Sequence, residues 1–181
     1  MSIRLIHLLG SPPLRERAAE IGRVTNEVRE LVRDLFDTMY AAKGVGLAAN
    51  QVGVTQRVAV VHTGEKDEPL VLIDPVIVER EDEATDEEGC LSIPEIYADV
   101  TRPAKVVVET TTLEGKRVQV PAADLKARAI QHEIDHLDGI LFLDKLSPLK
   151  RRLLLRKWKA MRKGETSLLR EVPETATPTN S

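Results

Sequence analysis

The chain has 181 residues, of which 42% are hydrophobic, so it is long enough for one globular domain with a core of its own. Its net charge of −3 gives the whole molecule no strong attraction to DNA, and no segment approaches the roughly 20 apolar residues of a membrane span. The one cysteine excludes an intramolecular disulfide framework and suits a reducing cytosol. The N-terminal apolar run, LIHLL, is shorter than the roughly 7–15 residues of a secretory signal, so we expect a cytoplasmic protein.

The first predicted element is an amphipathic helix over residues 25–42, in which apolar residues recur at steps of three and four. Gly44 and Gly46 follow directly and are expected to end the helix, with a strand of small residues after them. We expect the helix to cover a core from one side. Its apolar stripe consists of Val28, Leu31, Val32, Leu35, Phe36, Met39 and Tyr40.

The middle of the chain is rich in valine, isoleucine and leucine, which predicts strands. We expect strands over residues 57–62 and 70–79, with Pro75 indicating an edge or a bulge in the second. Residues 105–113 and 116–121 flank a Glu-Gly pair, a pattern typical of a β-hairpin. Between the second and third of these strands lies EDEATDEEGCLSIPEIY, a segment that is acidic at first and then abruptly apolar.

The helical pattern returns over residues 123–137, and Gly139 is expected to end this second helix. Two apolar-leaning stripes predict a helix that is packed on most sides. One stripe carries His132 and His136, and Glu133 lies between them, so three polar groups are expected inside the molecule. An unpaired buried charge is costly, and this already favours a metal ion as their partner.

The last predicted helix spans residues 145–163 and contains nine Lys and Arg residues but no acid. Without these nine positive charges, the net charge of −3 becomes −12 for the remaining residues, so the chain is strongly polarised. We expect Leu153, Leu154 and Trp158 to dock this basic helix on the domain. Residues 1–163 are predicted to form one catalytic domain, and residues 164–181 a flexible tail.

The motif QHEIDH suggests the first two ligands of a metal site, because His132 and His136 lie on one face of a helix. Such a site normally takes three protein ligands. The extended metzincin pattern requires a third histidine at the position of Phe142, so that interpretation fails. A thermolysin-like site requires a later glutamate, and the next one, Glu165, lies beyond the basic helix.

Cys90 is the favoured third ligand, because a thiolate binds Zn²⁺ or Fe²⁺ strongly. It follows Gly89, which allows close approach of the backbone, whereas an inert buried thiol is the alternative interpretation. His7 sits alone among leucines, and His62 ends a predicted strand. Both are better interpreted as histidines with ordinary structural partners.

Three segments, taken together and in this order, closely resemble the signature motifs of peptide deformylases. They are GVGLAANQ at residues 44–51, EGCLS at residues 88–92 and QHEIDH at residues 131–136. This family removes the formyl group from the N-terminal formyl-methionine of new proteins. The resemblance implies an α+β fold in which β-sheets surround a central helix carrying the HExxH motif. It also implies one divalent metal ion, with Fe²⁺ as the native metal and Zn²⁺ or Ni²⁺ as substitutes, bound by Cys90, His132 and His136.

The resemblance also implies roles in hydrolysis of the formyl amide. Glu133 is placed to take a proton from water and return it to the departing amine. The side-chain amide of Gln51 and the backbone N–H of Leu91 are expected to stabilise the oxyanion. Substrate contacts are expected from Gly44, Val45, Gly46, Gly89, Leu125 and Ala129, with the apolar members forming a slot for methionine.

Two further expectations remain, and two positions depart from the family pattern. Arg102 is expected to help shape the entrance. Tyr97 stands where some relatives have a basic residue, and Asp74-Pro75 stands where relatives often have Asn-Pro. Because formylated chains emerge from ribosomes, the basic helix of residues 145–163 could also contact ribosomal RNA or protein.

Overall fold

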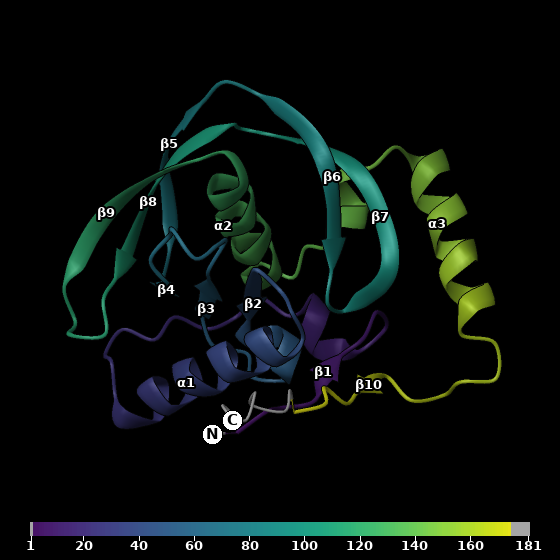
Figure 1. The fold of residues 1–181 in the computed structure, drawn as a ribbon, viewed down its shortest axis with the longest axis horizontal. Coiled ribbons are helices and arrows are strands. Elements are labelled where there is room, and N and C mark those ends of the chain that lie inside the picture. The colour runs from purple at the N-terminus through teal and green to yellow at the C-terminus, as the bar shows by residue number, and fades with distance from the viewer. Residues whose placement is uncertain (1, 175–181) are drawn as a thin grey trace, which may run out of the picture.

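The computed structural model describes residues 2–174, which fold around one central helix (Figure 1). This helix, α2 (Asp124–Leu137), has antiparallel β-sheets on several sides, whereas α1 (Asn26–Ala41) and α3 (Pro148–Met161) lie at the periphery. The strands are β1 (Ile6–His7), β2 (Gly46–Ala48), β3 (Val58–Val61), β4 (Leu70–Ile73), β5 (Val76–Glu81), β6 (Ala84–Cys90), β7 (Ile93–Arg102), β8 (Lys105–Thr111), β9 (Arg117–Ala123) and β10 (Leu169–Arg170). Short 3-10 helices are η1 (Pro12–Arg15), η2 (Ala49–Val52) and η3 (Phe142–Lys145).

Within residues 2–174 the strands form four small sheets, in the order β2-β3-β4, β5-β8-β9, β6-β7 and β1-β10. α2 is buried because its apolar residues pack against the first two of these sheets. Ala129, Ile130 and Leu137 of α2 share one core cluster with Ala59 of β3 and Val108 of β8. The expected α+β arrangement, with sheets around a central helix, is therefore confirmed.

α1 begins one residue later than predicted and covers the other face of the β2-β3-β4 sheet. The side chain of Thr25 accepts a hydrogen bond from the N–H of Val28, which caps the first turn. The predicted apolar stripe packs on the sheet, with Leu35 and Met39 fully buried, except for Tyr40, which is 47% exposed. Gly44 and Gly46 follow, and the expected strand of small residues is β2.

The strand predicted over residues 70–79 is two strands, because the chain turns at Asp74 with a φ of 47°. The carboxylate of Asp74 accepts hydrogen bonds from the backbone N–H groups of Ile21 and Gly22, at 2.8 and 2.9 Å, which fixes the turn. β5 then forms an edge of its sheet and contains a register shift at Ile77/Glu79, as Pro75 suggested. The hairpin of β8 and β9 agrees with the prediction.

The long hairpin of β6 and β7 was not predicted, and it carries Cys90 to the centre of the molecule. In β6 only Glu88 is buried, so the segment shows no regular apolar alternation and resembles an acidic loop. In β7 every second residue is buried, among them Ile96, Ala98 and Val100. The hairpin is therefore held by one face of β7.

α3 docks on the domain differently from the prediction. Trp158 is buried and Leu154 is half-buried, whereas Leu153 is 52% exposed. Leu155, in place of the predicted Leu153, packs against the core cluster that contains Trp158. Within residues 2–174, none of the helices combines the length and the apolar composition that crossing a bilayer requires.

The segment after α3 also differs from the prediction, which placed residues 164–181 in a flexible tail. Leu169 and Arg170 form β10, paired antiparallel with β1, and Val172 is only 9% exposed. The first part of the predicted tail therefore packs on the domain. The remainder, residues 175–181, lies outside the described residues.

Candidate metal centre and active site

Three potential metal ligands from two distant segments meet at one end of a cavity. Cys90 is the last residue of β6, and His132 and His136 lie one turn apart on α2. The Sγ of Cys90 is 3.3 Å from Nε2 of His136, and the two Nε2 atoms are 3.1 Å apart. Among the described residues, this is the one group of three or more His, Cys, Asp or Glu side chains whose ligand atoms converge in this way.

The distances between these atoms fit one shared metal ion. Two nitrogens at about 2.0–2.1 Å from an ion, at a tetrahedral angle, lie about 3.3 Å apart, and a thiolate at about 2.3 Å lies slightly farther away. Burial, together with the neighbouring His132, holds the pKa of His136 well below its usual range, whereas the burial of His132 is overcome by Cys90 and Glu88, which raise its pKa well above that range. The two rings therefore do not take a proton each. A neutral imidazole is the form that binds a metal, so the buried pair suits a cation better than two protons.

Glu88, which the sequence analysis did not single out, orients the first histidine. Its Oε1 lies 3.0 Å from Nδ1 of His132, so the Nε2 of the same ring is left to face the cluster. Burial favours the neutral carboxyl, but hydrogen bonds from His132 and Arg102 outweigh it and lower the pKa of Glu88 to about 2. A carboxylate that accepts from a metal-binding histidine fixes the ring and raises its basicity.

Arg102 does not shape the entrance, which corrects the expectation from the sequence. Its guanidinium is 4% exposed and donates to both oxygens of Glu88, at 2.6 and 2.9 Å, and to Asp135 at 2.8 Å. Arg128 adds a third bond to Glu88, at 2.6 Å. Arg102 and Arg128 therefore fix the carboxylate of Glu88, which in turn fixes the ring of His132.

Glu133 lies in a buried position beside the cluster, at the wall of the cavity. The residue is 4% exposed, and its Oε2 has no hydrogen-bond partner among the described residues. Burial raises the pKa of Glu133 to about 7, which a bound cation would lower again. The side chain fits because Gly46 has none, since a Cβ on Gly46 would lie 2.5 Å from Oε1.

Gln51 approaches the cluster from the other side, at the end of η2. Its Oε1 accepts from the N–H of Ala48 at 3.0 Å, so its Nε2 points inward. This Nε2 lies 3.1 Å from Oγ of Ser92 and 3.6 Å from Sγ of Cys90. The side chain is 1% exposed, so its amide is a fixed donor beside the sulfur.

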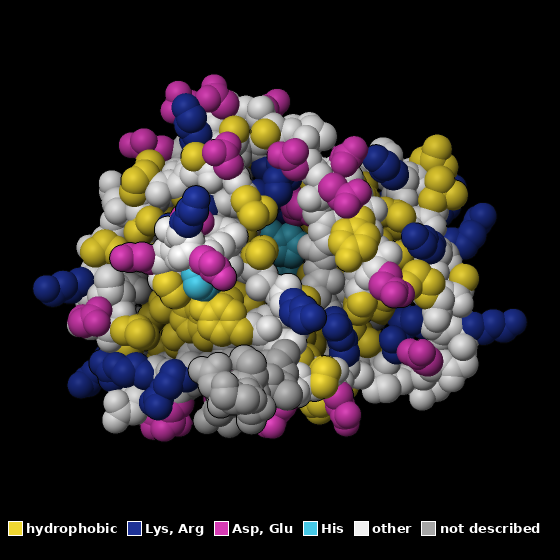
Figure 2. Space-filling view, viewed as in Figure 1, with side chains coloured by type: hydrophobic (Ala, Val, Ile, Leu, Met, Phe, Trp, Pro, Cys, Tyr) yellow, Lys and Arg dark blue, Asp and Glu magenta, His cyan; other side chains and the backbone are white. Residues whose placement is uncertain are grey.

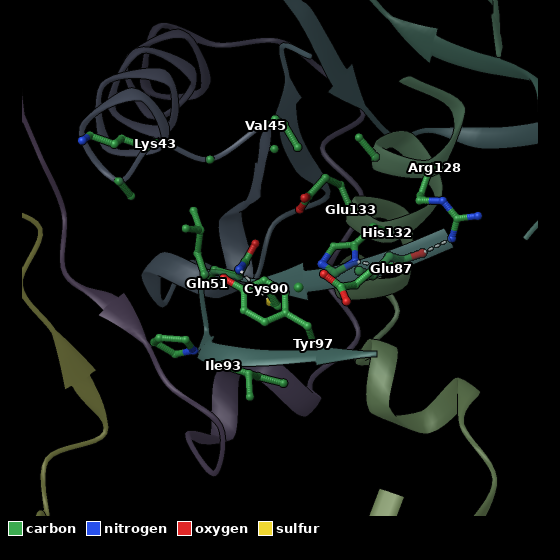
Figure 3. Close-up of a pocket in the computed structure, with 18 of the residues that line it drawn as sticks. Lys43, Val45, Gln51, Glu87, Cys90, Ile93, Tyr97, Arg128, His132 and Glu133 are labelled. Atoms are coloured by element: carbon green, nitrogen blue, oxygen red, sulfur yellow. Dashed lines mark hydrogen bonds and ion pairs between the residues drawn. The ribbon is translucent and has the colours of Figure 1, made fainter. Parts of the chain in front are cut away.

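The cavity in front of the cluster has a volume of about 490 Å³ and is lined by all six residues expected to contact a substrate (Figure 3). Figure 2 shows the hollow on one face, with a histidine side chain at its floor and Lys and Arg side chains at its rim. Val45 and Leu125 are 42% and 51% exposed, so they lie at its mouth. Its walls include Gly44, Val45, Gly46, Gly89, Leu91, Leu125 and Ala129.

The other two histidines lie elsewhere and have ordinary partners. Nδ1 of His62 is 2.7 Å from the hydroxyl of Tyr40, and its Nε2 is 2.9 Å from the carbonyl of Asp67. Nδ1 of His7 is 2.6 Å from Oγ of Ser11. Tyr97, by contrast, does line the cavity, where its ring covers the backbone of Gly89.

One thiol and two imidazoles around a shared point, with a buried carboxyl and an amide donor beside them, define the site of a metal-dependent hydrolase. Comparison with known proteins then identifies the family. A sequence model of the polypeptide deformylase family matches residues 3–152. The chain belongs to this family, whose members are metal-dependent enzymes that remove the N-formyl group from nascent peptides.

Relatives match over nearly the whole chain. The peptide deformylase of Alkalilimnicola ehrlichii is 47% identical over 171 residues, which cover 93% of this chain and 96% of the relative. The crystal structure of a peptide deformylase from Legionella pneumophila superposes with a TM-score of 0.84 at 42% identity, covering 90% of this chain and 96% of that one. The Ehrlichia chaffeensis enzyme in complex with actinonin gives 0.86 at 36% identity, with coverages of 92% and 100%.

Proposed function

We propose that this enzyme hydrolyses the formyl amide of N-formylmethionyl polypeptides and releases formate. The observation that carries the proposal is the meeting of Cys90, His132 and His136 beside a cavity that Cys90, His132 and Glu133 line. The experiment measures formate released from formyl-Met-Ala-Ser by the wild type and by Glu133→Ala, with unformylated Met-Ala-Ser as control. No formate from the wild type would refute the function, and undiminished release by the variant would refute the role of Glu133.

Cys90, His132 and His136 would hold one divalent ion, and we propose Fe²⁺ as the native metal, with Zn²⁺ and Ni²⁺ as substitutes. A thiolate with two imidazoles suits all three metals. When bound, such an ion acts as a Lewis acid and lowers the pKa of water towards neutrality. The Glu88 carboxylate supports this assignment, because it fixes the ring of His132 with one nitrogen directed at the shared point.

Glu133 is the proposed proton carrier. A carboxyl whose pKa is raised by burial can accept a proton from the attacking water and return it to the departing amine. Because Gly46 leaves the space for it, the carboxyl can face the reacting amide without competing with the three ligands. Proton transfer of this kind typically contributes about 10²–10⁴-fold to the rate.

Gln51 and Leu91 are the proposed donors to the oxyanion. The amide of Gln51 is held by Ala48 and Ser92, so it needs no rearrangement when charge develops on the formyl oxygen. Leu91 follows Cys90 directly, so its backbone N–H lies next to the ligand sulfur in the chain. Preorganised donors act strongly in a site that excludes water.

The mouth of the cavity supports a preference for methionine. Val45, Leu125 and Ala129 offer an apolar slot next to His132, and a flexible thioether side chain fills such irregular space well. Gly44 and Gly46 leave room for an extended peptide to pair with their backbone, and Gly89 lies on the opposite wall. We place the reaction in the cytoplasm, where nascent chains are made.

We further propose that α3 contacts the ribosome. The Lys and Arg side chains of α3 are exposed, whereas Arg162, directly after the helix, is engaged with the ring of Trp158 and with Glu165. Contacts of this surface with ribosomal phosphates would be salt-dependent. Co-sedimentation with ribosomes should occur at low salt and fall as salt rises, and binding that is absent at low salt or insensitive to salt would contradict the proposal.

A further inference from the structure

The C-terminal strand forms part of the active-site wall. β10 pairs with β1, Ile6 opposite Arg170 and His7 opposite Leu169. Two residues farther on, Val172 is buried beside Ile6 in a small cluster against which Leu91 packs. This arrangement brings Arg170 to the lining of the cavity, from a segment that lies beyond the residues matched by the family.

Arg170 contacts the turn between β6 and β7 that carries the proposed oxyanion donor. Its Nη1 donates to the carbonyl oxygen of Leu91 at 3.3 Å. A guanidinium has five N–H donors, so one such bond leaves most of its donors and its charge for another partner. Leu91 in turn lies against Gly44, where a Cβ would be 2.7 Å from the leucine Cδ1. Lys43 precedes Gly44 and lines the same cavity.

Charged residues of both signs line the cavity, and among them the guanidinium of Arg128 is paired with Asp86 and Glu88. The others come from different elements. Lys43 comes from the turn after α1 and Arg170 from β10, whereas Glu87 and Glu95 belong to the β6–β7 hairpin. Figure 3 shows Lys43 and Glu87 on opposite sides of Cys90. A peptide leaving the metal centre therefore passes between a basic wall, formed by Lys43 and Arg170, and an acidic wall, formed by Glu87 and Glu95.

The position of the basic wall along the peptide follows from the proposed function, on which this inference rests. The formyl group must lie at Glu133, beside Gly46, and the peptide must continue past Gly44 towards Lys43. Lys43 lies in the turn directly before Gly44, with a φ of 56°, and Arg170 contacts the carbonyl oxygen of Leu91, whose side chain lies against Gly44. An extended peptide advances about 3.3 Å per residue, so the residues that directly follow formyl-methionine are the first to pass Gly44. The two residues after formyl-methionine are thus the ones that reach the basic wall.

We propose that Arg170 is a specificity-determining residue, which the C-terminal strand supplies to the active site and which favours peptides with Asp or Glu at one of the two positions after formyl-methionine. An attraction between partly exposed charges is modest, and about 0.2–1 kcal/mol corresponds to roughly 1.5- to 5-fold in kcat/KM. It weakens as salt is added.

The test compares kcat/KM for two pairs of peptides, formyl-Met-Glu-Ala-Ser with formyl-Met-Lys-Ala-Ser, and formyl-Met-Ala-Glu-Ser with formyl-Met-Ala-Lys-Ser. The wild type should favour the Glu peptide in at least one pair, Arg170→Lys should keep that preference, and Arg170→Glu should reverse it. Arg33→Glu makes the same charge change on an exposed part of α1 that does not line the cavity, and it should leave the ratio unchanged.

Both peptides of a pair are measured with one enzyme preparation. The fraction of enzyme that is folded and loaded with metal therefore cancels in the ratio of the two kcat/KM values. The inference is overturned if Arg170→Glu keeps the wild-type ratios, or if Arg33→Glu shifts them equally. A uniform fall in kcat/KM for all peptides with unchanged ratios would also overturn it, because Arg170 would then act only through the Leu91 backbone. Failure of the wild type to deformylate formyl-Met-Ala-Ser would refute the proposed function instead.

Discussion

Gly46 and Glu133 occupy adjoining space so closely that no side chain on Gly46 is compatible with the observed carboxylate. A Cβ there would lie 2.5 Å from Oε1, 2.9 Å from Cδ and 3.0 Å from Cγ of Glu133. The glycine is therefore needed for close approach, and its conformation is not in the left-handed region. The strand that is proposed to pair with the substrate also shapes the position of the proposed proton carrier.

Gly46→Ala should reduce kcat/KM by about 10²-fold or more, because Glu133 must move away from the reacting amide and proton transfer is worth about 10²–10⁴-fold. Metal content and the circular dichroism spectrum should change little. The measurement is formate release together with metal analysis.

Gly64→Ala provides the matched control. A Cβ on Gly64 would meet nothing within 4 Å, so this variant should keep wild-type activity. Equal activities of the two alanine variants would show that Glu133 does not need its observed position.

Gln51→Leu should lower kcat by about 10²–10³-fold, because the oxyanion loses a fixed donor. KM should change little, since the interaction strengthens only as charge develops. Gln119→Leu, on the exposed face of β9, is the control and should be close to wild type. A rise in KM at unchanged kcat would assign Gln51 to substrate binding.

Glu88→Gln should weaken metal binding by about 10–100-fold, because the ring of His132 loses its carboxylate acceptor. Competition with a chelator measures the affinity. The variant should also be less stable, since Arg102 and Arg128 keep their buried charges without the carboxylate. Glu79→Gln, on exposed β5, controls for the loss of one charge, and equal affinities in both variants would contradict the role of Glu88.

The Fe²⁺ form should lose activity in air faster than the Ni²⁺ form. A thiolate ligand and a ferrous ion both oxidise readily, and Cys90 is only half-buried at the edge of the cavity. Activity followed over time in air and under argon tests this expectation. Equal decay of both forms in air would contradict it.

The sequence predicts those features that arise from local periodicity. α1 and α2 carry clear helical stripes, the Glu-Gly pair indicates the β8–β9 hairpin, and the spacing of His132 and His136 indicates a metal pair. Cys90 could be proposed because few other ligands were available in the chain.

Other features depend on long-range packing that no local pattern encodes. Glu88 looks like one acid in an acidic run, and only the β6–β7 register and the face of α2 bring it to His132. The burial of Arg102 follows from the same pairing of β6 with β7, which no local pattern reveals. Arg102 was therefore wrongly expected at the entrance. β10 has two residues and forms only because β1 is there to pair with it, so Arg170 could not be assigned to the cavity.

X-ray absorption spectroscopy at the metal edge of the zinc-loaded protein observes the three proposed ligands directly. The wild type should show one sulfur at about 2.3 Å and two imidazole nitrogens at about 2.0–2.1 Å, and the sulfur should disappear in Cys90→Ser. A wild-type ion surrounded only by nitrogen and oxygen, with an unchanged spectrum in Cys90→Ser, would show that Cys90, His132 and His136 do not form one metal centre.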